Sequence, residues 1–348
     1  MTREKGIRKR EGFSSVQYLL FIIITVSALL VCIVAGSVNI PIKDTVRIIL
    51  DSILGREVPP SAFKAIILSV RLPRVICVAL EGAALSLCGA CMQGLLQNPL
   101  ADGSTMGVSS GAALGAVLSL AFGITVPGFE QLGTMGMSML FACLSLFMIL
   151  SLAYRLDNSL ATYTIILIGV IFSMFVSSIL SLVVTFAPDR AKNIMFWTMG
   201  SLASTSFSDA VILLISLIVF GGILLSLSRE LNAFAIGEQN ALHVGVDVKK
   251  VKLVVLIAVS AMIGVCVSIG GTIGFVGLVI PHMTRLVVGP NHKKLLPACL
   301  FVGATFLMLA DLVARTILNP RELPIGVVTS FIGSITFIYI FYNSRRKQ

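Results

Sequence analysis

The stretch from Leu253 to Thr284 contains no Asp, Glu, Lys or Arg, and glycines interrupt it near its middle. An α-helix rises about 1.5 Å per residue and needs about 20 apolar residues to cross a bilayer, so the stretch is too long for one spanning helix and too short for two ordinary ones. Gly270, Gly271 and Gly274 stand where a helix should continue. Non-helical backbone at membrane depth is tolerated only where protein or a water-filled cavity surrounds it, so the stretch predicts two broken helices of the kind typical of transporters.

The composition indicates an integral membrane protein. Hydrophobic residues make up 57% of the 348 residues, charged residues make up 12%, and the mean hydropathy is +1.00. A water-soluble domain of this length does not need so much apolar surface. The net charge of +10 would suggest a nucleic-acid partner in a soluble protein. Here the basic residues gather at the termini and at the ends of apolar runs, as the positive-inside rule predicts, so we expect no nucleic-acid partner.

Charge-poor apolar runs predict an all-α polytopic membrane protein with about ten transmembrane helices. The runs lie at about 16–38, 72–97, 105–123, 132–154, 158–187, 209–228, 250–270, 273–287, 295–314 and 323–343. An even number of spans places both termini on one side, and the tails 1–15 and 344–348 are both basic, so both termini should be cytoplasmic. The segment 37–71 then lies outside, and we expect it to contain a short amphipathic helix around Ile42–Leu54.

Several segments carry motifs that point to one protein family. They are RLPRVICVALEGAALSLCGACMQGLLQNPLADGSTMGVSSGAALG at Arg71–Gly115, GTIGFVGLVIPHMTRLVVGPNHKKLLP at Gly271–Pro297, ADLVAR at Ala310–Arg315 with ELPIG after it, and LNAFAIGEQNALHVGV at Leu231–Val246. Together they resemble the FecCD-type family of ABC importer permeases, which transport iron complexes and vitamin B12. The resemblance runs in order from about residue 65 to 340.

The resemblance implies a vitamin B12 permease-like fold, with residues 1–348 as a single transmembrane permease domain of the cell (inner or plasma) membrane. Such a permease pairs with a second permease subunit, as a homodimer or a related heterodimer. Its other partners are cytoplasmic ABC ATPase subunits and an extracellular or periplasmic substrate-binding protein. The cargo would be an iron complex (siderophore or haem) or cobalamin, and the sequence leaves open which one. The sequence contains no GxxxxGK[ST] phosphate loop, so ATP hydrolysis must reside in a partner and this chain is not an enzyme.

The resemblance assigns contact with the ATPase to the cytoplasmic loop 229–252. We expect Leu231–Val246 to form a short helix that sits in a groove of the ATPase. Its small residues leave room for close approach, and Glu238 can meet a basic partner. The predicted coupling residues are Leu231, Ala235, Gly237, Glu238, Ala241, Leu242 and Gly245.

A cytoplasmic gate is predicted where two spans turn at the cytoplasmic face. Asn98, Pro99 and Leu100 follow the second span, and Thr162 stands at the start of the fifth. We expect these two segments to move toward or away from their counterparts in the second permease subunit during transport.

Three arginines are candidates for docking the binding protein on the outer side. Arg71 and Arg74 head the second span, and the family pattern uses them to meet acidic side chains, which suits the bidentate guanidinium. The alternative for both is that they anchor the span at the membrane interface. Arg315 lies four residues after Asp311 on one helical face, so these two side chains can instead form a structural pair.

Glu81 departs from the family pattern, which has an apolar residue at this position. The side chain lies several turns inside the second span, where an ionisable group is costly and is usually paired or functional. One interpretation is a protonated or locally hydrogen-bonded carboxyl packed inside the bundle. The other is a group that lines the pathway and contacts the cargo.

Two other classes of membrane protein compete with an ABC importer. An ion-coupled secondary transporter also uses broken helices but should couple through intramembrane carboxylates, of which this chain offers Glu81 and Asp311. An intramembrane enzyme needs a catalytic set inside its spans, whereas His243, His282 and His292 are expected in cytoplasmic loops. We therefore predict no catalytic residues, no metal site and no cofactor.

Overall fold

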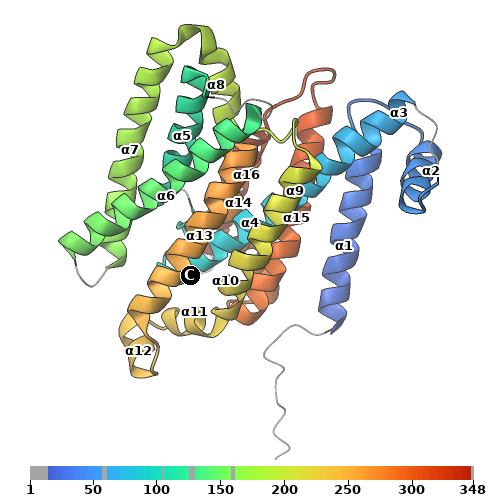
Figure 1. Cartoon of the computed structure of the whole chain (residues 1–348). Coiled ribbons are helices and arrows are strands. Elements are labelled where there is room, and N and C mark those ends of the chain that lie inside the picture. The colour runs from blue at the N-terminus through green and yellow to red at the C-terminus, as the bar shows by residue number, and fades with distance from the viewer. Residues whose placement is uncertain (1–14, 57–60, 104–105, 125–129, 158–160, 346–348) are drawn as a thin grey trace, which may run out of the picture.

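The computed structural model describes residues 15–56, 61–103, 106–124, 130–157 and 161–345, and every regular element in these ranges is helical (Figure 1). In chain order the elements are α1 (Ser15–Val34), α2 (Ile42–Ile53), α3 (Ala62–Ala65), the π-helical turn η1 (Ile66–Arg71), α4 (Leu72–Leu95), α5 (Val108–Phe122), α6 (Glu130–Leu156), α7 (Thr162–Phe186), the 3-10 turn η3 (Pro188–Arg190), α8 (Ala191–Thr198), α9 (Phe207–Ser216), the π-helical turn η4 (Leu217–Gly221), α10 (Gly222–Ser226), α11 (Ser228–Phe234), α12 (Glu238–His243), α13 (Val248–Gly270), α14 (Val276–Val288), α15 (His292–Thr316) and α16 (Ile325–Arg345).

Within the described ranges, 7 helices are long and apolar enough to cross a membrane. They are α1, α4 with α3 and η1 before it, α6, α7, α9 with η4 and α10 after it, α13 and α15. The shorter apolar helices α5, α14 and α16 coincide with the three remaining predicted spans. The all-α polytopic fold predicted from the apolar runs is therefore confirmed.

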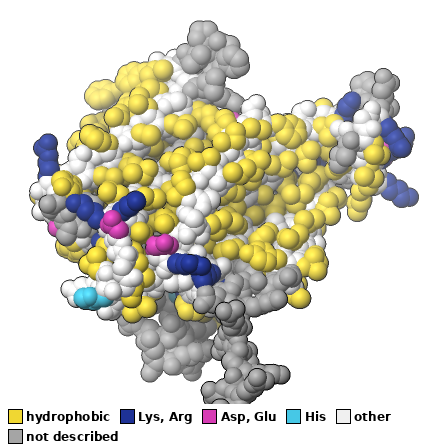
Figure 2. Space-filling model, turned by 60° about the horizontal axis from the view of Figure 1, so that its bottom comes forward, with side chains coloured by type: hydrophobic (Ala, Val, Ile, Leu, Met, Phe, Trp, Pro, Cys, Tyr) yellow, Lys and Arg dark blue, Asp and Glu magenta, His cyan; other side chains and the backbone are white. Residues whose placement is uncertain are grey.

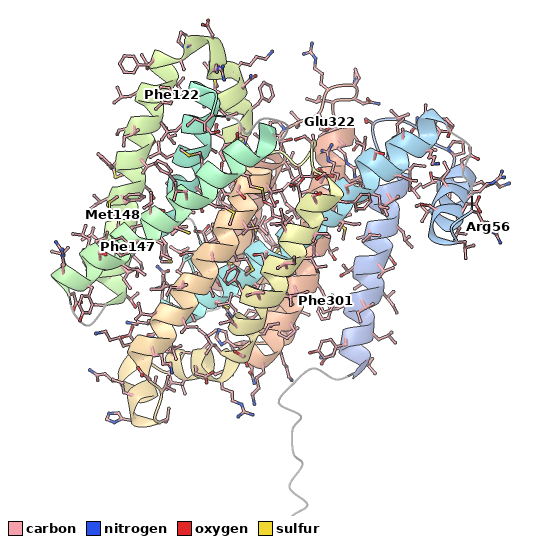
Figure 3. The ribbon with its side chains drawn as sticks, in the orientation of Figure 1. Arg56, Phe122, Phe147, Met148, Phe301 and Glu322 are labelled. Carbon is pink, nitrogen blue, oxygen red and sulfur yellow. The ribbon has the colours of Figure 1, made fainter. Side chains whose placement is uncertain are left out.

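The surface of the bundle is broadly apolar. Figure 2 shows hydrophobic side chains over most of the visible face, with charged side chains and histidine toward its edges. Phe147 and Met148 of α6, for example, are exposed on the outside of the bundle (Figure 3). Apolar patches of this extent mark surfaces that contact a membrane or another protein, which agrees with a position in the bilayer.

The orientation of the bundle follows from the basic residues of the cytoplasmic loops and of the tail before α1, although the segment 37–71 at the opposite end is also basic. α11 and α12 lie at one end, where α1 also begins, and α2, α3 and α8 lie at the opposite end (Figure 1). Basic residues gather at the α11–α12 end, namely Arg229, Lys249, Lys250, Lys293 and Lys294. By the positive-inside rule this end is cytoplasmic, and we call the opposite end the outer end.

The amphipathic helix expected in the segment 37–71 is present as α2. Ile48 on its inner side packs in a small buried cluster with Ile40 and with Ile67 of η1. Arg47 and Asp51 on its outer side form an exposed i,i+4 ion pair with an N···O distance of 3.6 Å. α2 therefore lies beside the spanning bundle, against η1, near the outer end (Figure 1).

α4 forms the centre of the bundle. Nearly all of its residues from Pro73 to Leu95 are buried, and α9, α13, α14 and α15 pack around it. The packing depends on glycine at two crossings, because a side chain on Gly82 would overlap the backbone of Gly303 in α15, and one on Gly89 would overlap that of Gly277 in α14. Small residues at helix crossings allow close packing in lipid, which explains why this apolar helix is rich in Gly and Ala.

The predicted break lies between α13 and α14. α13 ends at Gly270, and Gly271 follows with a φ of 71°, a conformation that favours glycine. The backbone N–H of Ser201 donates to the Gly270 carbonyl at 2.8 Å, and the Thr272 hydroxyl donates to the Thr198 carbonyl. The non-helical backbone is thus hydrogen-bonded by the segment after α8, as its depth in the bundle requires.

Candidate functional site

The predicted coupling segment contains two short helices. α11 and α12 are separated by a turn at Gly237, which has a φ of 115°, and Gly245 after α12 has a φ of 86°. Both angles are ones that residues with a side chain rarely adopt. The expectation of one helix over Leu231–Val246 is therefore wrong, because the backbone at Gly237 leaves the helical path.

The predicted coupling residues divide into an anchoring set and an exposed set. Leu231 and Ala241 are fully buried and hold α11 and α12 against the bundle, whereas Ala235, Leu242 and Gly245 are exposed. Ile236 and Val244 are exposed beside them and were missed by the sequence analysis. Their signal was present in the sequence, because large apolar residues in a cytoplasmic loop indicate a surface that another protein covers.

Glu238 joins the coupling segment to two spanning helices. Its Oε1 atom lies 2.7 Å from the Nζ atom of Lys252 in α13 and accepts a hydrogen bond of 3.0 Å from the hydroxyl of Thr162, the first residue of α7. Lys252 is 0% exposed and Glu238 is 34% exposed at the side chain. The structure therefore brings a predicted coupling residue and a predicted gate residue into direct contact. The sequence analysis did not identify Lys252. Its signal was a charged residue in the first turn of an apolar span, where such a group is usually paired or functional.

Asn232 makes a second connection, from α11 to the start of α15. Its Oδ1 atom accepts from the backbone N–H of His292 at 2.8 Å and lies 2.9 Å from the Nδ1 atom of the same residue. Its Nδ2 atom donates to Oδ1 of Asn291, the N-cap of α15, at 3.0 Å. His292 is buried in the first turn of α15, and His282 lies inside α14, so the expectation of loop positions for these two histidines is wrong.

The two predicted gate segments lie at the ends of different helices, one after α4 and one at the start of α7. Asn98, Pro99 and Leu100 form a turn after α4, in which Oδ1 of Asn98 accepts from the backbone N–H of Leu100 at 2.9 Å. Leu100 is exposed there. Thr162 begins α7, and both positions belong to the cytoplasmic end. The role of these residues as a gate stays a prediction.

The three candidate docking arginines lie together at the outer end, but their guanidinium groups are buried. Arg71 donates to the carbonyls of Ile33 at 3.2 Å, Val34 at 2.9 Å, and Val38. Arg315 donates to the Cys32 carbonyl at 3.1 Å. The last carbonyls of α1 lack partners within their own helix, and arginine near a helix C-terminus satisfies them and favours the helix dipole.

Arg74 and Arg315 share a buried carboxylate. Oδ1 of Asp311 lies 2.8 Å from Nη2 of Arg74, and Oδ2 of Asp311 lies 2.9 Å from Nε of Arg315. Arg74 also pairs with Oε2 of Glu322 at 2.7 Å, and Glu322 is 33% exposed at the outer end (Figure 3). The structural pair between Asp311 and Arg315 is thus confirmed. Docking by these arginines stays a prediction, and it would require an acidic partner to compete with carboxylates that already hold them.

Glu81 is fully buried in α4, and within the described ranges neither of its carboxylate oxygens has a hydrogen-bond partner. Its carboxyl group lies against Gly270, where an added Cβ atom would be 2.6 Å from each oxygen. Glycine at the end of α13 therefore makes the room that this carboxyl occupies.

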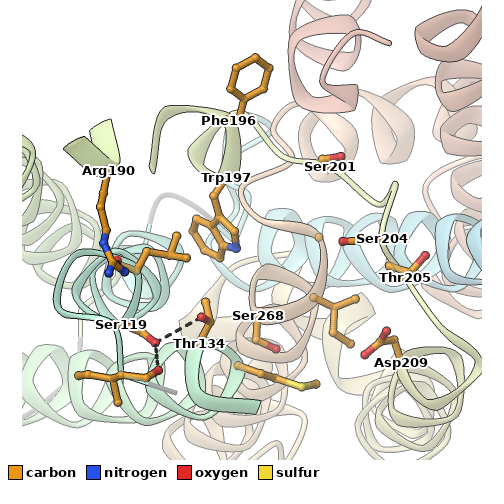
Figure 4. Close-up of a pocket in the computed structure, with 16 residues that line it drawn as sticks. Ser119, Thr134, Arg190, Phe196, Trp197, Ser201, Ser204, Thr205, Asp209 and Ser268 are labelled. Atoms are coloured by element: carbon orange, nitrogen blue, oxygen red, sulfur yellow. Dashed lines mark hydrogen bonds between the residues drawn. The ribbon is translucent and has the colours of Figure 1, made fainter. Parts of the chain in front are cut away.

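Gly270 also lines a cavity of about 480 Å³ toward the outer end of the chain (Figure 4). α5, α6, α8, α9 and α13 contribute to its walls. Its polar lining is rich in hydroxyl groups and includes one acid, one base and one indole: Ser119, Thr134, Ser201, Ser204, Thr205, Ser268, Asp209, Arg190 and Trp197. The sequence analysis did not identify this cavity, because its lining comes from several helices and loops between Ser119 and Gly270 that only the fold brings together.

Comparison with known proteins places this geometry in a family. The model of the FecCD transport family matches residues 21–343. The chain is 40% identical to an uncharacterized ABC transporter permease protein, YvrB, of Bacillus subtilis, over 98% of this chain and 97% of that protein. It is 37% identical to the cobalamin import system permease protein BtuC of Halobacterium salinarum, over 81% of this chain and 74% of that protein.

A solved structure shows the same architecture. An ABC transporter of the metal-chelate type, in an inward-facing conformation, superimposes with a TM-score of 0.81 at 29% identity, over 95% of this chain and 100% of that one. The family match, the full-length relative and the shared architecture agree with the motifs at Arg71–Gly115 and Gly271–Pro297. The chain belongs to the FecCD transport family and is the multi-pass, membrane-embedded permease of a binding-protein-dependent ABC importer, without ATPase activity of its own.

Proposed function

We propose that the importer carries an iron complex, either a siderophore or haem, or cobalamin. The proposal rests on one observation. The chain matches the family over its whole helical bundle, and the bundle has a cavity near its outer end and a coupling segment at its cytoplasmic end. Relatives with 35–38% identity are named for cobalamin, for iron chelatin and for molybdate. Iron chelates and cobalamin carry many hydrogen-bonding groups, and the hydroxyl groups of the outer cavity offer partners for such groups.

The cargo can be tested in proteoliposomes that contain this permease with its ATPase and binding-protein partners. We expect ATP-dependent accumulation of one class of labelled cargo among ⁵⁵Fe-siderophore, haem and ⁵⁷Co-cobalamin. An ATPase partner with an inactivated phosphate loop is the control and should abolish accumulation. Accumulation of molybdate with none of the three would contradict the proposed cargo. Accumulation that follows an ion gradient without ATP would support a secondary transporter instead.

We further propose that two permease subunits, two copies of this chain or a related pair, form the transport pathway between them. α7 supports this proposal because most of its surface is left uncovered by the chain and is available to a second subunit. Its buried residues are Ile165, Ile168, Gly169 and Val176. Cysteines placed at Leu100 and at Tyr163, the exposed residue next to Thr162, should change their cross-linking across the pair when ATP is added. Identical cross-linking with and without nucleotide would argue against the proposed gate.

The exposed residues Ile236, Leu242 and Val244 support the ATPase contact, since they form an apolar surface at the cytoplasmic end. Gly237→Trp should lower ATP-dependent uptake, because the indole would stand between the two helices and Trp does not readily adopt a φ of 115°. Pull-down of the ATPase by the variant measures the contact directly. Unchanged pull-down and uptake would show that the segment is not the coupling surface.

A further inference from the structure

We propose that Glu238 is the positioning residue that transmits movement of α12 to the first turn of α7. This inference rests on the proposed ATPase contact and adds the internal route by which that contact reaches the gate. Its starting point is that one carboxylate oxygen meets both Lys252 of α13, at 2.7 Å, and Thr162 of α7, at 3.0 Å.

α12 is built to move as a unit. It has six residues and lies between Gly237 and Gly245, two glycines with positive φ. Hinges are short segments that absorb a change in φ and ψ, and glycine does so at least steric cost. In α12, Ala241 is fully buried and Glu238, which is 34% exposed, pairs with Lys252 of α13.

α11 is the fixed part of the coupling segment. Leu231 and Phe234 are both fully buried. Asn232 ties α11 to α15 through three short polar contacts with Asn291 and His292. Because Oδ1 of Asn232 can only accept, the Nδ1 atom of His292 carries the proton in this contact. When the ATPase moves against the exposed surface of the coupling segment, we therefore expect α12 to rotate about Gly237 and Gly245 while α11 stays in place.

Glu238 converts that displacement into a movement at the gate. The positive charge of Lys252 fixes the carboxylate, because a fully buried ammonium group is strongly stabilised by its counter-ion. The carboxylate in turn orients the Thr162 hydroxyl at the first residue of α7, where the predicted gate lies. A shift of α12 must either carry Thr162 with it or break a hydrogen bond to a charged group, so the two helices move together.

The decisive test follows the amide hydrogen exchange of α12 and of the first turn of α7 in the complete transporter, with and without ATP and vanadate. In the wild type we expect nucleotide to change exchange in both segments. Thr162→Val keeps the shape of the side chain and removes the donor, so the change should persist in α12 and disappear in α7. Glu238→Gln retains an acceptor but loses the charge that pairs with Lys252, so the bond to Thr162 is weaker and the change in α7 should be reduced. Thr164→Val, two residues farther along α7, is the matched control and should behave as the wild type.

Uptake per ATP hydrolysed gives the second measurement. Both variants should lower this ratio, and Thr162→Val should lower it about tenfold, the scale of one hydrogen bond to a charged group. The double variant should be no worse than Thr162→Val alone, because both changes act on the same link. Multiplicative effects, or a wild-type exchange response of α7 in Thr162→Val, would overturn the proposal. Failure of the wild type to take up any tested cargo would count against the proposed function alone, since hydrogen exchange needs no cargo.

Discussion

The two ends of this permease use the same ionic chemistry for different purposes. At the outer end, the buried Arg74 meets Glu322, which is 33% exposed; at the cytoplasmic end, the buried Lys252 meets Glu238, which is 34% exposed. The difference lies in the other partners. Arg74 also has Asp311, which is itself buried and lies on the long helix α15, whereas Glu238 also holds Thr162, which begins a different helix.

This comparison indicates which end is rigid. In the outer cluster, the buried carboxylate of Asp311 lies between the buried side chains of Arg74 and Arg315, and Glu322 pairs with Arg74 from the exposed side. The cluster therefore fixes α4 to α15. The cytoplasmic link has a carboxylate that belongs to a six-residue helix bounded by glycines. A charge cluster on long continuous helices stabilises the fold, and a similar pair on a short hinged helix can pass a movement to the helix that it contacts.

The largest effect should come from breaking the outer cluster at its centre. Asp311→Asn leaves Arg74 and Arg315 buried without their shared anion, and loss of one partner from a buried ion pair costs about 3–5 kcal/mol. We expect a lower yield of folded protein and a lower unfolding temperature in detergent, measured with a thiol-independent fluorescence assay. Glu322→Gln, at the exposed edge of the same cluster, is the control. A small effect of Asp311→Asn would show that this end does not stabilise the fold.

The cytoplasmic link should respond unequally to loss of its two charges. Glu238→Ala leaves the ammonium of Lys252 buried and should cost about 2 kcal/mol of unfolding free energy, less than at Asp311 because water reaches this end more easily. Lys252→Met leaves a carboxylate that water can reach and fills the buried site with an apolar chain, so it should change stability by less than about 1 kcal/mol. Chemical unfolding of both variants measures the difference. Equal costs would mean that burial of Lys252 is not the controlling feature.

Glu81 should behave unlike either cluster, because its carboxyl group is buried without a hydrogen-bond partner in the described ranges. An unsatisfied buried polar group costs about 1–3 kcal/mol, so Glu81→Leu should raise the unfolding temperature. If the carboxyl contacts the cargo, uptake will fall in both Glu81→Leu and Glu81→Gln while stability is kept. A rise in stability with normal uptake would assign Glu81 to packing alone.

The sequence predicted those features that depend on neighbouring residues. Apolar runs defined the spans, the glycines at 270 and 271 marked the break, and the four-residue spacing of Asp311 and Arg315 predicted their pair. Contacts between distant residues were not accessible in this way. Arg74 and Glu322 are 248 positions apart, and Glu238 and Thr162 are 76 apart, so only the packing of the helices brings each pair together.

The same limit explains the one-helix error in the coupling segment and the unforeseen burial of the outer arginines. Gly237 was chosen for its small size, but its positive φ, which divides the coupling segment into α11 and α12, depends on how both helices pack. Burial of the outer arginines was likewise invisible, because the carbonyls that hold Arg71 belong to the end of α1. Basic residues near a span end therefore suggested a docking surface, whereas their guanidinium groups already donate to carbonyl and carboxylate groups of this chain.

The smallest predicted effect concerns whether Arg74 still serves an external partner. Exposed ion pairs contribute about 0–1 kcal/mol, and Glu322 sits at the accessible side of Arg74. If an acidic group of the binding protein competes with Glu322, Glu322→Gln should tighten association up to about fivefold, and most at low ionic strength, where screening is least. Surface plasmon resonance on the permease in nanodiscs measures this. Glu57→Gln, an acid elsewhere in the segment expected outside, is the matched control. Unchanged association at every salt concentration would confine Arg74 to holding α4 against α15.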